Sequence, residues 1–176
     1  MYIFEALTKI QRNIGRRILS KTTQSNKFER LTKFKVARKI GVVYNMQDMP
    51  KEYIHKIIHH FESDGKSVFT LGFVNEKDIS GLLPNYKESY FCKTDLNFWK
   101  IPQGDRISKF IHEDFDFLIN LDLTGDNELQ GISTFSKAKT RIGKYFDEYL
   151  FAHDLMVKSG SHEVYSLFID IIRHIK

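Results

Sequence analysis

The segment from Phe115 to Leu123 reads FDFLINLDL and is the most apolar strand-like stretch of the chain. Apolar residues occupy alternate and neighbouring positions in it, which is typical of a strand covered on both faces. Two more runs with strand character come earlier, KIGVVY from Lys39 to Tyr44 and SVFTLGFV from Ser67 to Val74. We therefore predict a sheet in which Phe115 to Leu123 holds a central position.

Helical patterns separate these strands. After Pro50, apolar residues recur at Ile54, Ile57 and Phe61, and Asp64-Gly65 ends that helix. The same periodicities predict helices around 107–111, at 127–137 and at 162–175, and strands at 90–93, 139–143 and 153–157. Regular alternation of strand and helix, joined by right-handed crossovers, predicts a Rossmann-like three-layer α/β sandwich with a mainly parallel sheet.

The positive charge of the chain is concentrated at its N-terminus. Residues 1–39 hold eleven basic and two acidic side chains, a net charge of +9, while the other 137 residues hold 16 basic and 20 acidic side chains, a net charge of −4. The basic residues are Lys9, Arg12, Arg16, Arg17, Lys21, Lys27, Arg30, Lys33, Lys35, Arg38 and Lys39. Such asymmetry favours a polyanionic partner. We predict a basic N-terminal helix and arm at 1–38 and a Rossmann-like α/β domain at 39–176.

The first part of this arm is predicted to be an amphipathic helix. Its apolar stripe consists of Ile3, Leu7, Ile10, Ile14 and Ile18, with Phe4 beside it. A polar linker follows at 20–26, and apolar anchors then alternate with basic residues at Phe28, Leu31, Phe34 and Val36. The pattern leaves open whether the arm lies on RNA, on lipid or on its own domain. A protein partner on the apolar face of the helix is also compatible with it.

In α/β sheets, ligands bind beyond the carboxyl ends of the strands where the strand order reverses, which points to the loops after Tyr44 and Asp122. The first loop, NMQDMP, contains no glycine and therefore lacks the usual means of holding a nucleotide phosphate. The second places Asp122, Asp126 and Glu128 at a helix N-terminus, where carboxylates stabilise the helix dipole and repel anions. Helix capping by Asp126 or Asn127 is the favoured interpretation, ahead of catalytic carboxylates and an incomplete calcium loop.

Other candidate groups have a structural explanation that we favour. His55 and His59 have a spacing compatible with metal binding. They lie beside the apolar face of their helix, so we expect them to be solvated side chains and not metal ligands. Cys92 has no neighbours that would activate a thiol. One stretch of the chain interleaves lysines with the aromatic residues Tyr86, Tyr90, Phe91, Phe98 and Trp99. Such a stretch would suit the stacking of nucleic-acid bases, but we favour a loop that packs on its own aromatic side chains. We predict no catalytic residue, no cofactor and no metal ligand.

Composition restricts the setting. A hydrophobic content of 41% with three prolines is that of a globular chain, and a single cysteine excludes an internal disulfide. No apolar run reaches the length of a membrane span, and the arm lacks the apolar core of a secretory signal, although its composition also suits an organellar transit peptide. We expect a cytoplasmic protein.

Several motifs carry a resemblance to known sequences. From Lys39 to Lys176 the chain resembles an uncharacterised family of small α/β proteins from Bacteroidota, through KIGVV (39–43), GKSV (65–68), LGFV (71–74), FCKTDLN (91–97), FDFLINL (115–121) and SKAKTRIG (136–143). This resemblance implies a bacterial cytoplasmic protein without an established activity. Residues 115–143 are also similar to the N-terminal half of heptosyltransferase-type glycosyltransferases, which need two such halves where this chain has room for one.

These observations predict a non-enzymatic, RNA-associated protein that docks on the ribosome through the basic arm. RNA is preferred because basic residues continue from Lys27 to Lys39, beyond the amphipathic helix, as in an arm that follows phosphates. The alternative is a membrane-peripheral protein of envelope biosynthesis, in which the apolar stripe enters anionic lipid. A small autonomous enzyme is a third possibility, without a recognisable acid, base or nucleophile.

Overall fold

Strands and helices alternate along the chain in the computed structural model, which describes residues 2–22 and 33–176, with side chains from residue 5 onward. The strands are β1 (Lys39–Asn45), β2 (Ser67–Val74), β3 (Glu88–Cys92), β4 (Phe117–Asn120), β5 (Thr140–Lys144) and β6 (Leu155–Val157). The α-helices are α1 (Tyr2–Thr22), α2 (Lys51–Ser63), α3 (Asp105–Ile111), α4 (Asn127–Phe135) and α5 (Val164–Ile175). Short 3₁₀ turns occupy Phe34–Val36 (η1), Lys93–Asp95 (η2) and Asp147–Tyr149 (η3).

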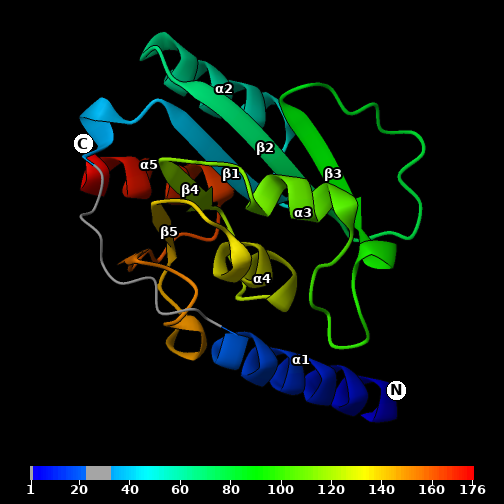
Figure 1. The fold of residues 1–176 in the computed structure, drawn as a ribbon. Coiled ribbons are helices and arrows are strands. Elements are labelled where there is room, and N and C mark those ends of the chain that lie inside the picture. The colour runs from blue at the N-terminus through cyan, green and yellow to red at the C-terminus, as the bar shows by residue number, and fades with distance from the viewer. Residues whose placement is uncertain (1, 23–32) are drawn as a thin grey trace.

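The six strands form one parallel sheet in the order β3-β2-β1-β4-β5-β6 (Figure 1). Val43 of β1 lies beside Leu71 on one side and Asn120 on the other, so the strand order reverses between β1 and β4. This is the order of a doubly wound Rossmann-like sheet, and the predicted fold class is confirmed. In folds of this kind ligands bind beyond the carboxyl ends of the strands at the point of reversal, which here is at β1 and β4.

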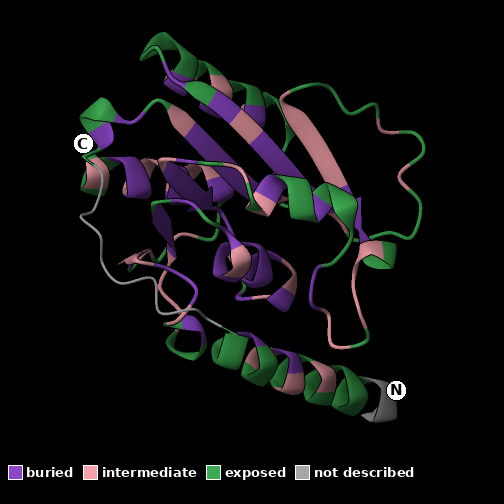
Figure 2. Cartoon of the chain, in the orientation of Figure 1, coloured by how far each residue is buried: buried purple, intermediate pink, exposed green. Residues whose placement is uncertain are grey.

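Helices cover both faces of the sheet and give three layers. One core cluster joins α2 and α5 to side chains such as Ile40 and Val42, and the other joins α3 and α4 to side chains such as Val43 and Leu118. Alternate residues of β1 thus serve opposite cores, as the pleat of a strand requires. Figure 2 shows that β1 and β4 themselves are almost entirely buried.

The predicted central position of FDFLINLDL is confirmed, although strand β4 itself spans only Phe117–Asn120. All four of its residues are buried, between β1 and β5. Gly41 of β1 allows this packing, because a Cβ there would lie 2.8 Å from the ring of Phe115. Gly65 adopts a φ of +72° directly after α2 and ends that helix, as the sequence predicts.

The predicted apolar anchors before β1 have different outcomes. Phe28 and Leu31 lie outside the described residues. Phe34 is buried and packs edge-on against Phe117 with ring centroids 5.5 Å apart. Val36 was expected to be an anchor as well, and this is wrong, because it is 68% exposed at the end of η1. The turn that brings the Phe34 ring into the core points Val36 outward.

Candidate binding surfaces at the carboxyl edge of the sheet

Helix α1 lies across the N-terminal end of α4, at the carboxyl edge of the sheet (Figure 1). A glycine makes this close approach possible: a Cβ on Gly15 would lie 2.2 Å from the carbonyl oxygen of Trp99 and 2.4 Å from Nδ2 of Asn127. The same Nδ2 donates hydrogen bonds to the carbonyl oxygens of Arg12, at 2.9 Å, and Trp99, at 3.3 Å. One turn further on, Leu19 is fully buried beside Gly131 of α4. The sequence left open whether the arm lies on RNA, on lipid or on its own domain. The structure shows that its first part, helix α1, packs on the domain.

Two ion pairs reinforce this docking. The guanidinium of Arg12 lies 2.6 Å from Oδ1 of Asp126, the residue before α4, and that of Arg16 lies 3.8 Å from Oε1 of Glu148 in η3. The side chain of Glu148 is 58% exposed, so the second pair is both long and solvated. Pairs of this kind contribute little to stability. Arg12 thus belongs to the docking contact, while Arg16 is only loosely held.

Asp122 organises the loop between β4 and α4. Its carboxylate is buried and accepts hydrogen bonds from the backbone N–H groups of Thr124, Gly125 and Asp126 and from Nε2 of Gln130, at 2.7–3.1 Å. Burial raises the pKa of Asp122, and the hydrogen bonds from Gln130 and from the backbone oppose that change. With both oxygens saturated by loop donors, this carboxylate has a structural role.

Asp126 and Asn127 do not cap α4 with their side chains, so the favoured sequence interpretation of this pair is wrong. Asp126 stands at the N-cap position without a side-chain capping bond and instead accepts from the hydroxyl of Thr124 at 2.7 Å. Asn127 has its amide in the α1 contact, and its Oδ1 accepts from the hydroxyl of Tyr149 at 2.7 Å. Both side chains are committed to holding α1 and η3 against the start of α4.

A buried polar chain continues from Asp122 into the sheet. Gln130 donates to Asp122, so its Oε1 accepts from Nε2–H of His153 at 2.9 Å, which assigns the proton of the ring to Nε2. Burial, together with the charge of Arg141, lowers the pKa of His153 to about 3. Arg141 is itself buried and forms a bidentate pair with Asp154, with contacts of 2.7 and 3.0 Å. Sequence reasoning missed these residues, since an isolated polar residue in an apolar segment gives no signal of its partner.

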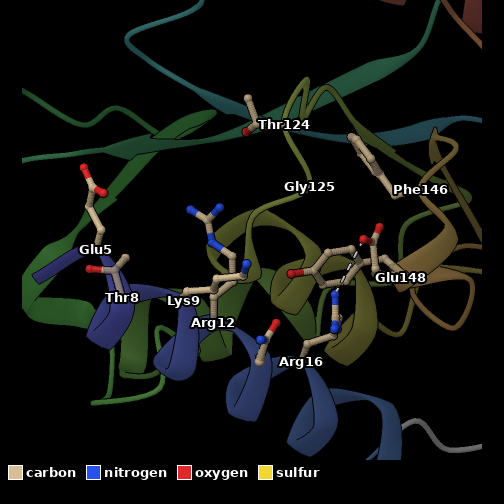
Figure 3. Close-up of a pocket in the computed structure, with 11 residues that line it drawn as sticks. Glu5, Thr8, Lys9, Arg12, Arg16, Thr124, Gly125, Phe146 and Glu148 are labelled. Carbon is tan, nitrogen blue, oxygen red and sulfur yellow. Dashed lines mark ion pairs between the residues drawn. The ribbon is translucent and has the colours of Figure 1, made fainter. Parts of the chain in front are cut away.

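A cavity of about 560 Å³ lies between α1 and the loops that follow β4 and β5 (Figure 3). One wall is a row of α1 side chains, and the other comes from the Thr124 loop and the segment after β5. The lining residues are Glu5, Thr8, Lys9, Arg12, Asn13, Arg16, Thr124, Gly125, Phe146, Glu148 and Tyr149. The cavity adjoins the sheet edge at which the sequence predicts any ligand.

The eleven predicted RNA-binding residues are distributed over two ends of the molecule. Lys9, Arg12, Arg16, Arg17 and Lys21 lie on α1 at the carboxyl edge, and Lys33, Lys35, Arg38 and Lys39 precede or begin β1 at the opposite, amino edge (Figure 1). Lys27 and Arg30 lie outside the described residues. Lys39 pairs with Glu113, while Arg17 and Lys21 are exposed without an ion-pair partner in the described part of the chain. RNA binding by this set stays a prediction, as does the division into 1–38 and 39–176.

Most of the apolar stripe of α1 is exposed to solvent. Leu7 and Ile10 are each 52% exposed and Ile18 is 38% exposed, while Ile14 is half-buried. Figure 2 shows the buried positions of α1 on the side that faces α4 and exposed positions elsewhere. We call Leu7, Ile10, Ile14 and Ile18 the apolar ridge. A helix normally buries its apolar stripe against its own domain, so this exposed ridge is a candidate binding surface.

The remaining candidates from the sequence are mostly solvated. His55 and His59 are exposed on α2, and no group of three or more His, Cys, Asp or Glu among the described residues is placed to hold a metal ion. Cys92 is buried. In the aromatic stretch, Phe91 is buried in the core, whereas Tyr86 and Phe98 are 86% and 67% exposed, so only part of that loop packs on its own rings.

Fold and surface features define a Rossmann-like α/β protein whose N-terminal helix lies across the carboxyl edge of its sheet. Residues 11–174 match the model of DUF6913, described as a family of unknown function. The chain belongs to this family, and the prediction of an uncharacterised family is confirmed. The match begins within α1 and so includes Gly15 and Leu19. Neither a curated protein nor a solved structure matches the chain. None of the described helices is long and apolar enough to cross a membrane.

Proposed function

We propose that this protein binds the surface of anionic membranes through α1. The observation that carries the proposal is the apolar ridge: the helix is fixed to the domain by Gly15, Leu19 and Arg12, while Leu7, Ile10 and Ile18 are exposed to solvent. A basic helix that lies in the plane of a bilayer needs this arrangement, with apolar residues toward the acyl chains and cations at the level of the headgroups.

Cations accompany the ridge. Arg17 and Lys21 are both exposed on the same helix, and neither has an ion-pair partner in the part of the chain that the structure describes. Positions 17 and 21 lie one turn or less from Ile14 and Ile18, so their long side chains can reach phosphate groups while the ridge enters the interface. In the sequence the apolar stripe extends back to Ile3 and Phe4, whose side chains lie outside the description.

Approximate energies indicate that both components are needed. Burying a whole Leu or Ile side chain contributes about 1.5–3 kcal/mol, and the ridge residues are already partly covered, which leaves roughly 1 kcal/mol for each. Each cation beside an anionic surface adds about 1 kcal/mol. Either contribution alone gives weak, reversible binding, and their sum gives a measurable preference for anionic lipid.

Lipid is preferred to RNA on the same geometry. RNA is bound through phosphate contacts and stacked bases, and an aliphatic ridge offers neither. Arg12 is paired with Asp126, and the basic residues near β1 lie at the other end of the sheet. Other expectations from the sequence stay predictions: a role in envelope biosynthesis, a cytoplasmic location, an origin in Bacteroidota and a relationship to heptosyltransferase-type enzymes.

Vesicle flotation tests the proposal. The parent protein is expected to float with vesicles that contain phosphatidylglycerol and not with pure phosphatidylcholine. Leu7→Asp combined with Ile10→Asp is expected to abolish flotation, and Leu83→Asp, which alters an 88% exposed residue elsewhere, is the matched control. Arg17→Gln with Lys21→Gln is expected to weaken flotation, whereas Lys33→Gln with Lys35→Gln, at the amino edge, leaves it unchanged.

Two results would reverse this proposal. Binding of the parent to RNA but not to anionic vesicles would restore the ribosomal prediction. The second result is a parent protein that does not bind vesicles and has twice the monomer mass in light scattering. If the Leu7 and Ile10 substitutions return this mass to the monomer value, the ridge binds a second copy of the chain.

A further inference from the structure

We propose that the cavity between α1 and the loops after β4 and β5 binds a small phosphorylated molecule that carries a flat ring. This site is separate from the apolar ridge and goes beyond the proposed membrane role. Its volume of about 560 Å³ lies within the range of sites for small organic ligands, roughly 300–1,000 Å³. Its position beyond the carboxyl ends of β4 and β5 is where α/β proteins place their ligands.

The helical wall supplies a row of cations. Lys9, Arg12 and Arg16 are three and four residues apart, so they share one face of α1, and the first and last lie about 10 Å apart along the helix axis. Lys9 has no ion-pair partner among the described residues, and Arg16 holds the exposed carboxylate of Glu148 only at 3.8 Å. Figure 3 shows Arg16 extending from α1 toward Glu148 at one end of the cavity.

These two cations can therefore receive an anion at small cost. The Arg16–Glu148 pair is long and solvated, and such pairs contribute at most about 1 kcal/mol, so a phosphate can replace Glu148 on the guanidinium. Arg12 is held more closely by Asp126, at 2.6 Å, and remains part of the docking contact. The opposing charges in the lining are Glu5 and Glu148, and both are exposed at the cavity mouth, where solvent screens them.

The opposite wall supplies an aromatic surface. Phe146 is half-buried, with its ring against Gly125, where a Cβ would lie 3.1 Å from the ring. Tyr149 stands edge-on to it with ring centroids 6.5 Å apart, and the ammonium of Lys144 lies 5.8 Å from the Phe146 centroid. A half-buried ring in the cavity lining, on the wall opposite the α1 cations, suits a planar group attached to a phosphate.

Titration calorimetry of the full chain, without lipid, tests this site with four probes: a nucleoside monophosphate, the corresponding nucleoside, glycerol phosphate and inorganic phosphate. The monophosphate is expected to bind at least tenfold more tightly than any of the others, because only it carries both ring and phosphate. Equal affinity of glycerol phosphate would show that the cavity takes lipid-type headgroups and would overturn the requirement for a ring.

Variants locate the binding. Lys9→Gln and Arg16→Gln are each expected to weaken the monophosphate at least tenfold, and Phe146→Leu is expected to reduce its advantage over glycerol phosphate. Lys109→Gln, which removes an exposed cation of α3 outside the cavity lining, is the control and should leave affinity unchanged. Absence of binding by all four probes, or equal binding by parent and Arg16→Gln protein, would overturn the proposal. Neither outcome depends on vesicle binding, so the two proposals can fail separately.

Discussion

The carbonyl oxygen of Trp99 lies where a side chain on Gly15 would have to begin, since a β-carbon there would stand 2.2 Å from it. A glycine inside a helix costs about 1 kcal/mol relative to alanine. At this position the cost is offset by the close approach of α1 to the loop before α3. The position of α1 on the domain thus depends on the absence of a side chain.

Gly15→Ala is expected to detach α1 although it raises intrinsic helix propensity. In proteins most of the stability of an amphipathic helix comes from its tertiary packing, so a detached α1 should fray and become a protease substrate. Limited trypsin digestion followed by mass spectrometry should show faster cleavage after Arg12, Arg16 and Arg17. Ser20→Ala, at an exposed position of the same helix, is the control. Equal cleavage rates for the parent and Gly15→Ala would mean that the docking contact is not limiting.

A double-mutant cycle distinguishes the observed role of Asp126 from helix capping. Because its carboxylate pairs with Arg12, Asp126→Ala should destabilise the parent but have less effect when Arg12 is already alanine. The expected coupling is about 0.2–1 kcal/mol, the range of partly exposed ion pairs. Urea unfolding of the four proteins measures it. Full additivity, with the cost of Asp126→Ala independent of residue 12, would contradict the ion-pair role.

His153 should make stability depend on pH in the acid range. Its pKa is lowered to about 3 in the folded protein, against about 6.5 in the unfolded chain, so the unfolded state takes up the proton first as the pH falls. The contribution of His153 is complete above about pH 6.5 and is lost toward pH 3, by up to about 1.4 kcal/mol per pH unit. The raised pKa of buried Asp122 acts in the opposite direction, so the parent curve alone is not diagnostic.

The comparison with His153→Gln isolates that contribution. Urea unfolding between about pH 7 and pH 4 should show a steeper fall in stability for the parent than for the variant, because both share the Asp122 effect. Parallel curves would show that His153 takes up its proton in the folded protein as readily as in the unfolded chain, and would contradict its lowered pKa.

Local patterns predict most of the fold. Strand and helix periods in segments such as 39–44 and 162–175 depend on nearest neighbours in sequence, and these elements form where expected. The central position of Phe117–Asn120 follows from its apolar character on both faces. The ends of the elements were predicted less accurately: strand β4 ends at Asn120, whereas the apolar pattern continues to Leu123.

The candidate surfaces were predictable only in part. The sequence indicates the carboxyl edge and an amphipathic basic helix, but which face of α1 packs inward is decided by Gly15 and its fit to Trp99, contacts distant in sequence. For the same reason the distribution of the basic arm over two ends of the sheet, and the engagement of Asp126 by Arg12, do not follow from composition. Charge shows that a partner is attracted, and tertiary packing decides which charges remain available.

The central place of β1 has a consequence for biosynthesis. β1 is the first strand made, yet its second neighbour is β4, which emerges only after β2, β3 and α3. Parallel neighbours cannot be joined by a hairpin, so one hydrogen-bonding edge of β1 stays unpaired during much of translation. Unpaired strand edges recruit other chains, and we expect the nascent protein to aggregate most readily before residue 120 is available.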